Sequence, residues 1–126
     1  MLGRRYAVPE KTRCALERVF EAPMDGIVVI ENSLYARAHL GMCATTRPNR
    51  ILLAISGAEF AANSELLLHE YFHVMRQWHP GHLTRWRYLT ESARRGYHAN
   101  RYEQEAREFA AVTRGRFEQY LQELAQ

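Results

Sequence analysis

The strongest constraint on the fold is the run ELLLHEYFHVMRQW at residues 65–78, which is apolar on nearly every face once it is wound into a helix. Such a helix is predicted to lie at the centre of the protein, because a surface helix would carry polar side chains opposite its core face. The run nevertheless contains His69, Glu70 and His73. Buried polar side chains are costly without partners, so this helix needs a group that satisfies them.

A divalent metal ion is one partner that meets this need. Residues four apart lie one turn apart on the same helical face, so His69 and His73 can direct two imidazoles at one ion. Glu70 lies about 100° around the helix, where it can accept a proton from a metal-bound water but does not bind the metal. This spacing, H-E-x-x-H on a helix, is typical of metallopeptidases. The alternative is a pair of core histidines that are satisfied without a metal.

A catalytic zinc site uses a third protein ligand, and the stretch NRYEQEAREFA at residues 100–110 offers several glutamates. Glu103 is followed three residues later by Ala106, and a small residue there lets this helix approach the H-E-x-x-H helix closely. Glu105 is followed by bulkier side chains, so we favour Glu103 as the ligand and keep Glu105 as the alternative. Glu103 also lies three residues after Asn100, and the competing interpretation is therefore a helix-capping box.

The remaining patterns predict an α+β fold. Helical patterns cover residues 9–20, 65–78, about 85–95 and the stretch after residue 100, and strand patterns cover residues 26–31, about 39–46 and 50–56. Pro48 and Asn49 supply turn chemistry, so the last two strands are expected to pair antiparallel. Asn63 or Ser64 caps the central helix, and Gly96 stops the next one. The order of helix, strands and then helices is typical of the α+β class.

Length and composition favour one soluble domain over residues 1–126. The net charge is +3, but the basic residues are scattered among acids, which argues against a nucleic-acid partner. No stretch approaches the roughly 18 apolar residues of a membrane span. The N-terminus has no apolar segment after its arginines, so no signal peptide is expected and the predicted compartment is the cytoplasm, with export by a dedicated secretion system left open. The sequence does not predict an oligomeric state.

The chain resembles the gluzincins, which are metallopeptidases with H-E-x-x-H on one helix and a ligating glutamate on a later one. LLLHEYFHVMRQW is similar to their active-site helix, and YEQEAREFA resembles the third-ligand helix of the CAAX-prenyl-protease and ImmA/IrrE-type peptidases. On that overlay Glu103 takes the ligand position, while the chain departs at Arg107, where some relatives carry an acid that supports a metal-binding histidine. The whole chain is most similar to small bacterial zincin-like domains and to the single-domain minigluzincins.

This resemblance implies a minimal zincin-like domain, with a small antiparallel or mixed sheet packed on the H-E-x-x-H helix and the glutamate-bearing helix. It also implies Zn²⁺ bound by His69, His73 and Glu103, and hydrolysis of a peptide or protein substrate by a metal-activated water with Glu70 as general base. Tyr97 and His98 are candidates for stabilising the oxyanion, with Tyr97 favoured; the alternative is that both are loop residues that pack on the surface. The strand at 50–56 is either the edge to which a substrate strand adds or an interior strand. The alternative function is a metal-bound protein-binding module with little turnover, for example in a toxin or secretion system; a third possibility is an interaction protein without metal.

Overall fold

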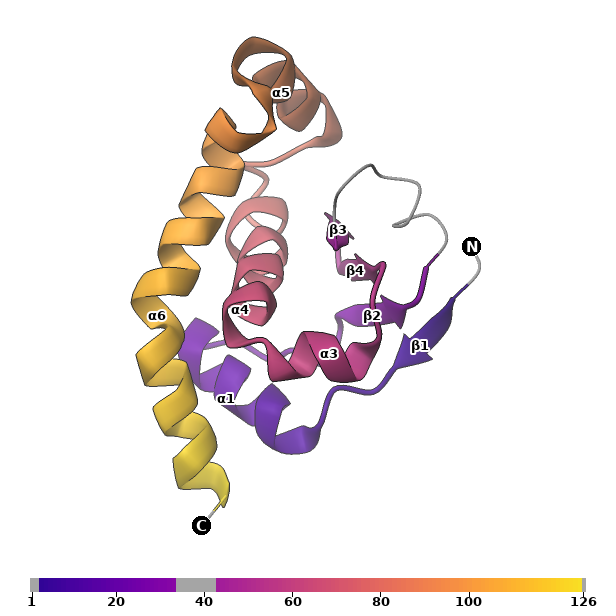
Figure 1. The fold of residues 1–126 in the computed structure, drawn as a ribbon. Coiled ribbons are helices and arrows are strands. Elements are labelled where there is room, and N and C mark those ends of the chain that lie inside the picture. The colour runs from indigo at the N-terminus through magenta and orange to yellow at the C-terminus, as the bar shows by residue number, and fades with distance from the viewer. Residues whose placement is uncertain (1–2, 34–42, 126) are drawn as a thin grey trace.

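Four short strands form one sheet in the computed structural model, which describes residues 3–33 and 43–125 and all of their side chains except those of residues 97–99. The strands are β1 (Arg4–Tyr6), β2 (Val28–Glu31), β3 (Ala44–Arg47) and β4 (Arg50–Leu53), in the spatial order β1-β2-β4-β3 (Figure 1). β1 pairs antiparallel with β2, β2 runs parallel to β4, and β3 pairs antiparallel with β4. The sheet is therefore mixed, with β1 and β3 at its edges.

Helices make up most of the remaining described chain. They are α1 (Glu10–Phe20), α3 (Gly57–Ala62), α4 (Ser64–Phe72), α5 (Arg85–Ala99) and α6 (Arg101–Ala125), and a π-helical segment, η1 (His73–Trp78), continues α4. α4 lies between the sheet and the long α6, and α5 projects at the end of the molecule opposite the C-terminus (Figure 1). Among the described helices, none combines the length and the apolar composition that crossing a membrane requires.

The hydrophobic core forms where α1, α4, α6 and the sheet meet. α4 contributes Leu67, Leu68 and Tyr71, and Val74 follows them in η1. The other large side chains buried in this core include Leu16, Val29, Ile51, Leu53, Phe60 and Phe117. Burying a side chain of this size stabilises the fold by about 1.5–3 kcal/mol. The prediction that the H-E-x-x-H helix is central is confirmed, because it packs on both the sheet side and α6.

The predicted α+β class is confirmed, and the turn at Pro48 and Asn49 joins β3 to β4 as expected. Asn49 adopts a left-handed backbone with φ 61°, a conformation that asparagine tolerates better than most residues. The strand at the start of residues 50–56 is β4, which lies inside the sheet, so its proposed role as an edge is wrong and the interior alternative holds. Residues 39–42 of the second predicted strand lie outside the described residues, and β3 begins at Ala44.

Two elements, β1 and α3, were not predicted from the sequence. β1 is only three residues long and carries two arginines, so its pattern does not read as a strand, and it forms through pairing with β2. α3 is held to this end of the sheet by the backbone N–H of Gly57, which donates to Glu31 Oε1 at 2.8 Å. The ring of Tyr6 lies so close to Gly57 that a Cβ there would stand 2.1 Å from it. Only glycine fits at this junction between β1 and α3.

The helix boundaries follow the predicted caps. The side-chain oxygen of Asn63 accepts a hydrogen bond from the backbone N–H of Leu66 at 3.1 Å, so Asn63, and not Ser64, caps α4. Beyond η1 the chain turns at Gly81, whose φ is 80°. Gly96 interrupts α5 with φ 79° and ψ 168°, which ends its regular turns close to the predicted position. The left-handed backbone at both glycines is accessible to them at low cost.

Candidate metal centre

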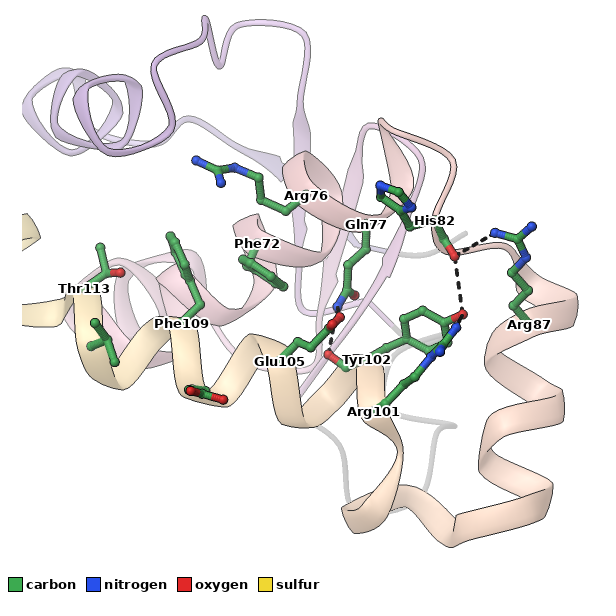
Figure 2. Close-up of a pocket in the computed structure, with 12 residues that line it drawn as sticks. Phe72, Arg76, Gln77, His82, Arg87, Arg101, Tyr102, Glu105, Phe109 and Thr113 are labelled. Atoms are coloured by element: carbon green, nitrogen blue, oxygen red, sulfur yellow. Dashed lines mark hydrogen bonds between the residues drawn. The ribbon is translucent and has the colours of Figure 1, made fainter.

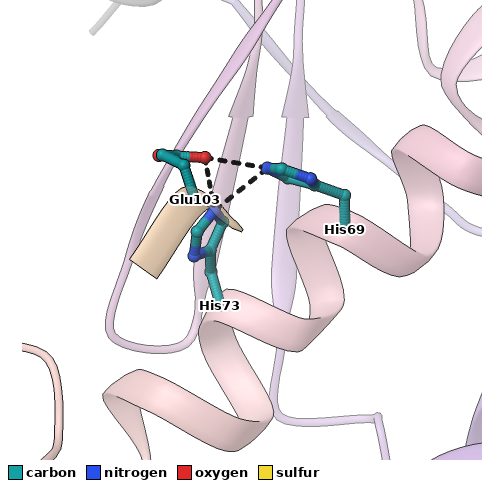
Figure 3. A group of neighbouring side chains, drawn as sticks. All are labelled: His69, His73 and Glu103. Carbon is teal, nitrogen blue, oxygen red and sulfur yellow. Dashed lines mark hydrogen bonds and ion pairs between the residues drawn. The ribbon is translucent and has the colours of Figure 1, made fainter. Parts of the chain in front are cut away.

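His69 and His73 present their Nε2 atoms to the same point, as their spacing on the helix predicts (Figure 3). His69 belongs to α4, and His73 is the first residue of η1. The two Nε2 atoms lie 3.2 Å apart, and the rings meet at an interplanar angle of 79°. The His73 side chain is buried, whereas the His69 side chain keeps 14% of its surface exposed. Solvent therefore reaches the two histidines from the side of His69.

Glu103 closes the group from α6. Its Oε1 lies 2.9 Å from His69 Nε2 and 3.1 Å from His73 Nε2 (Figure 3). Glu103 shares the buried face of α6 with Ala106, Ala110, Thr113 and Phe117, and that face packs on α4. Ala106, the small residue one turn after Glu103, is fully buried, which fits the predicted close approach of the two helices.

The alternatives for Glu103 do not match this geometry. Glu105 accepts a hydrogen bond from Gln77 Nε2 at 3.1 Å and does not belong to the group of potential ligands found among the described residues. Asn100 caps α6 by accepting from the backbone N–H of Tyr102 at 2.8 Å. The Glu103 carboxylate faces the two histidines and not the start of its own helix, so the interpretation as a capping box is wrong.

Gln77 supports His73 and was not recognised in the sequence. Its Nε2 donates to the backbone carbonyl of Tyr102 at 2.9 Å and to Glu105 Oε1, so its Oε1 is the atom that faces His73 Nδ1, 2.6 Å away. An amide oxygen only accepts, and the Nδ1 of His73 therefore carries a proton that it donates to Gln77. In the neutral imidazole this leaves the lone pair on Nε2, the atom that faces Glu103 and His69. Gln77 thus selects the tautomer that can bind a metal.

The sequence did contain a signal for Gln77. Residues 69, 73 and 77 form a series with a spacing of four, which places them on one helical face. The backbone is π-helical over this turn, with the N–H of His79 bonded to the carbonyl of Val74 at 3.0 Å. π-helical turns are often found at functional sites. Gln77 thus supports His73 in a chain that has an arginine, and not an acid, at position 107.

Tyr88 is the second supporting residue that the sequence did not reveal. Its hydroxyl donates to Glu103 Oε2 at 2.8 Å, which leaves Oε1 directed at the histidines. Tyr88 lies on α5, fifteen positions before Glu103, and no local pattern links the two residues. The side chain of Tyr97, the predicted oxyanion stabiliser, lies outside the part of the structure that is described, and its role stays a prediction.

The charges of the group are coupled. Burial lowers the pKa of His73, but the hydrogen bond and negative charge of Glu103 outweigh this and raise it to about 8. Burial also raises the pKa of Glu103, yet the hydrogen bonds from the two histidines and from Tyr88 bring it well below its usual range. At neutral pH the metal-free group therefore combines a Glu103 carboxylate with a positive charge on His73.

Glu70 has a different environment. Its side chain is buried beside the group, with Oε2 3.9 Å from His69 Nε2. Burial raises the pKa of Glu70 above its usual value, and the neighbouring His73 and His69 lower it in part. Glu70 makes none of the short contacts that join the other three side chains, which agrees with the expectation that it does not act as a ligand.

The donor atoms fit a tetrahedral ion. Bonds of about 2.0–2.1 Å to a tetrahedral metal keep the ligand atoms about 3.3 Å apart. The three separations between His69 Nε2, His73 Nε2 and Glu103 Oε1 are 2.9, 3.1 and 3.2 Å. Small outward movements of the side chains are sufficient to admit an ion. The group can therefore hold a metal ion through two nitrogens and one carboxylate oxygen.

A groove of about 650 Å³ has Gln77 among its lining residues (Figure 2). Phe72 and Phe109 line its apolar part, and Arg76 and Glu105 add charges of both signs. His69, His73 and Glu103 are not among its lining residues. None of the three potential ligands thus lines the groove, and the Gln77 side chain, which does, also contacts His73.

Comparison with known proteins adds no further assignment. No protein-family model matches the chain, no curated protein matches it, and no solved structure matches it. The case for a metal centre therefore depends on the side chains described above. The resemblance to gluzincins stays a prediction.

Proposed function

We propose that the protein is a zinc-dependent peptidase of the gluzincin type, built as a minimal single domain. The observation that carries this proposal is the meeting of His69, His73 and Glu103 at one point, with the carboxylate of Glu70 buried beside them. Two imidazoles and one carboxylate are the protein ligands of several zinc peptidases, in which the fourth position is left for water or substrate. Zinc is proposed over other divalent ions because nitrogen-rich, four-coordinate sites suit it.

The residues of this chain would divide the chemistry of amide hydrolysis between them. Bound zinc supplies Lewis acidity, which lowers the pKa of a water toward about 7 and polarises a carbonyl. Glu70 takes a proton from the attacking water and delivers it to the leaving amine. Gln77 and Tyr88 hold the ligand side chains in their binding orientations. Tyr97 is proposed to donate a hydrogen bond to the oxyanion.

A peptide substrate would add as a strand along β3, the edge of the sheet nearest to η1. Trp78 Nε1 donates to Thr46 Oγ1 at 3.1 Å and joins the H-E-x-x-H segment to this edge. An extended peptide that pairs with β3 would cross the group on the side where His69 is exposed. This arrangement favours an endopeptidase that recognises its substrate through hydrogen bonds to the peptide backbone.

The proposal is tested with the variant Glu70→Gln. Purified protein is loaded with zinc, and cleavage of a mixed peptide library is followed by mass spectrometry. The wild type should bind about one zinc and cleave, while Glu70→Gln should bind zinc and cleave at least about 100-fold more slowly, because a positioned base contributes roughly 10²–10⁴ in rate. Glu59→Gln makes the same change on the exposed surface of α3 and should cleave like the wild type. If the wild type and Glu70→Gln cleave the library equally, the proposed peptidase activity with Glu70 as general base is excluded.

The burial of the group favours a second candidate function. His69 is the most exposed of the three ligand side chains, and it keeps only 14% of its surface. A closed site of this kind suits a metal-bound module that binds a protein partner and turns over little substrate, because structural zinc sites are closed. Stoichiometric zinc without measurable cleavage by the wild type would support this second function. A wild type that binds no metal would contradict both.

A further inference from the structure

The outer face of α5 carries an apolar patch that faces solvent. Among the described residues the large hydrophobic side chains that are exposed are Trp86, Leu89 and Val112, and the first two lie on α5. Trp86 is 77% exposed and Leu89 is 60% exposed. Successive residues turn by about 100° in a helix, so Trp86, Leu89 and Ala93 fall within about 60° of one another. We call these three residues the α5 patch.

Positive charge frames the α5 patch on both sides. The helix contains four arginines and a single acid, Glu91. Arg85 borders the patch on one side and Arg94 borders it on the other, and both side chains are exposed. Glu91 is buried, where its carboxylate pairs with Arg95 at 3.4 Å and accepts from the backbone N–H of Arg101 at 3.2 Å. The outer face of α5 therefore combines apolar contact area with positive charge and has no exposed carboxylate of its own.

The inner face of the same helix explains why the apolar residues point outward. Tyr88 is turned toward α6, where it holds Glu103, and Glu91 is buried against the start of α6. The inward positions of α5 are thus taken by polar side chains, and the exposed hydrophobic ones, Trp86 and Leu89, lie on the other side of the helix. A helix with this pattern buries its apolar side only when something docks on it.

We infer that the α5 patch is a docking surface for a protein partner with an acidic, amphipathic segment. Tryptophan and arginine are the residues most enriched among binding hot spots, and here they adjoin one another. A second copy of this chain is a poor occupant, since its arginines would face the same arginines. An anionic membrane is also less suitable, because membrane binding scales with the apolar area that is buried, whereas the described part of α5 presents three exposed apolar side chains and the helix is broken at Gly96. The inference does not depend on the proposed hydrolysis.

The test uses the full chain carrying Glu70→Gln, so that a bound peptide is not cut if the protein is a peptidase. The probe is a fluorescent helical peptide of about 18 residues, with leucines along one face and glutamates on both sides of them. Binding is measured by fluorescence anisotropy at low and high salt. We expect saturable binding that weakens in salt, because the framing charges are exposed. A matched peptide with lysine in place of glutamate should not bind.

The variants distinguish binding at the α5 patch from non-specific hydrophobic binding elsewhere on the surface. Trp86→Ala and Leu89→Ser should each weaken binding at least about tenfold, and the double change Arg85→Gln with Arg94→Gln should reduce its dependence on salt. Val112→Ser removes an equally exposed hydrophobic side chain from α6 and should leave binding within about twofold. The absence of saturable binding, or an equal loss in Val112→Ser, overturns the inference. Binding only to vesicles of phosphatidylcholine and phosphatidylserine, or only self-association that Trp86→Ala abolishes, overturns it in favour of a membrane or a second copy.

Discussion

Replacing Gln77 with leucine tests whether the side chains around the potential ligands act as their support. Gln77 is 2% exposed and makes three hydrogen bonds, to His73, to the backbone carbonyl of Tyr102 and to Glu105. Leucine has a similar volume and no polar atoms. The change therefore leaves the His73 Nδ1–H without a partner in the interior. The Tyr102 carbonyl loses one hydrogen bond but stays the helical acceptor within α6, and the exposed Glu105 regains water.

Two consequences follow from this geometry. A buried group left without a partner costs about 1–3 kcal/mol, so the loss at His73 Nδ1–H should lower the free energy of unfolding of the metal-free protein by roughly that amount. Affinity for zinc should fall by about 10–100-fold, because the tautomer and orientation of His73 are no longer fixed. The first effect tests packing and hydrogen bonding, and the second tests the role of Gln77 toward the metal.

Both quantities can be measured on the same samples. Urea unfolding with a chelator present gives the stability of the metal-free protein, and competition with a chromophoric chelator gives the affinity for zinc. The matched control is Gln104→Leu, which makes the same substitution at an exposed position of α6 and should change neither quantity much. If Gln77→Leu binds zinc within about twofold of the wild type, Gln77 does not position His73, whatever the loss of stability.

Three further predictions concern charge, support and capping. In metal-free protein the free energy of unfolding should fall by about 2 kcal/mol between about pH 6 and pH 9, because the pKa of His73 is 6.5 in the unfolded chain and about 8 in the folded protein. The stabilisation from protonated His73 is complete below the lower pKa and is lost above the higher one. Urea unfolding at several pH values with a chelator present measures this change, and a stability that does not vary with pH contradicts it. Tyr88→Phe removes the hydrogen bond to Glu103 and should weaken zinc binding about tenfold by chelator competition; unchanged affinity would show that Glu103 needs no such support. Asn63→Ala removes the α4 cap and should lower the free energy of unfolding by about 1 kcal/mol in urea, while a loss well under half of that would mean that water replaces the cap.

Much of the potential metal group could be predicted because its local part depends on helical periodicity alone. The spacing of His69 and His73 places both imidazoles on one face in any α-helix, and the apolar residues around them require that helix to be central. The choice of Glu103 over Glu105 was also favoured by local pattern. Glu103 is in phase with the buried residues of α6, such as Ala106 and Ala110, whereas Glu105 lies on the exposed side of the helix.

Other features could not be read from the sequence, because they form between segments that are distant along the chain. β1 is a strand only through its pairing with β2, and α3 is held by Gly57 against Tyr6 and Glu31. The position of β4 inside the sheet depends on its parallel pairing with β2, which no local pattern encodes.

The sequence by itself determined that two imidazoles share a buried helical face, since a fixed rotation per residue makes that a local property. Only the tertiary structure decided what surrounds them. The packing of α6 on α4 brings the Glu103 oxygen to the two nitrogens, and the turn into α5 brings the Tyr88 hydroxyl to the other oxygen of the same carboxylate. Such contacts depend on how helices pack, because the hydrophobic surfaces that set the packing are contributed by several segments at once.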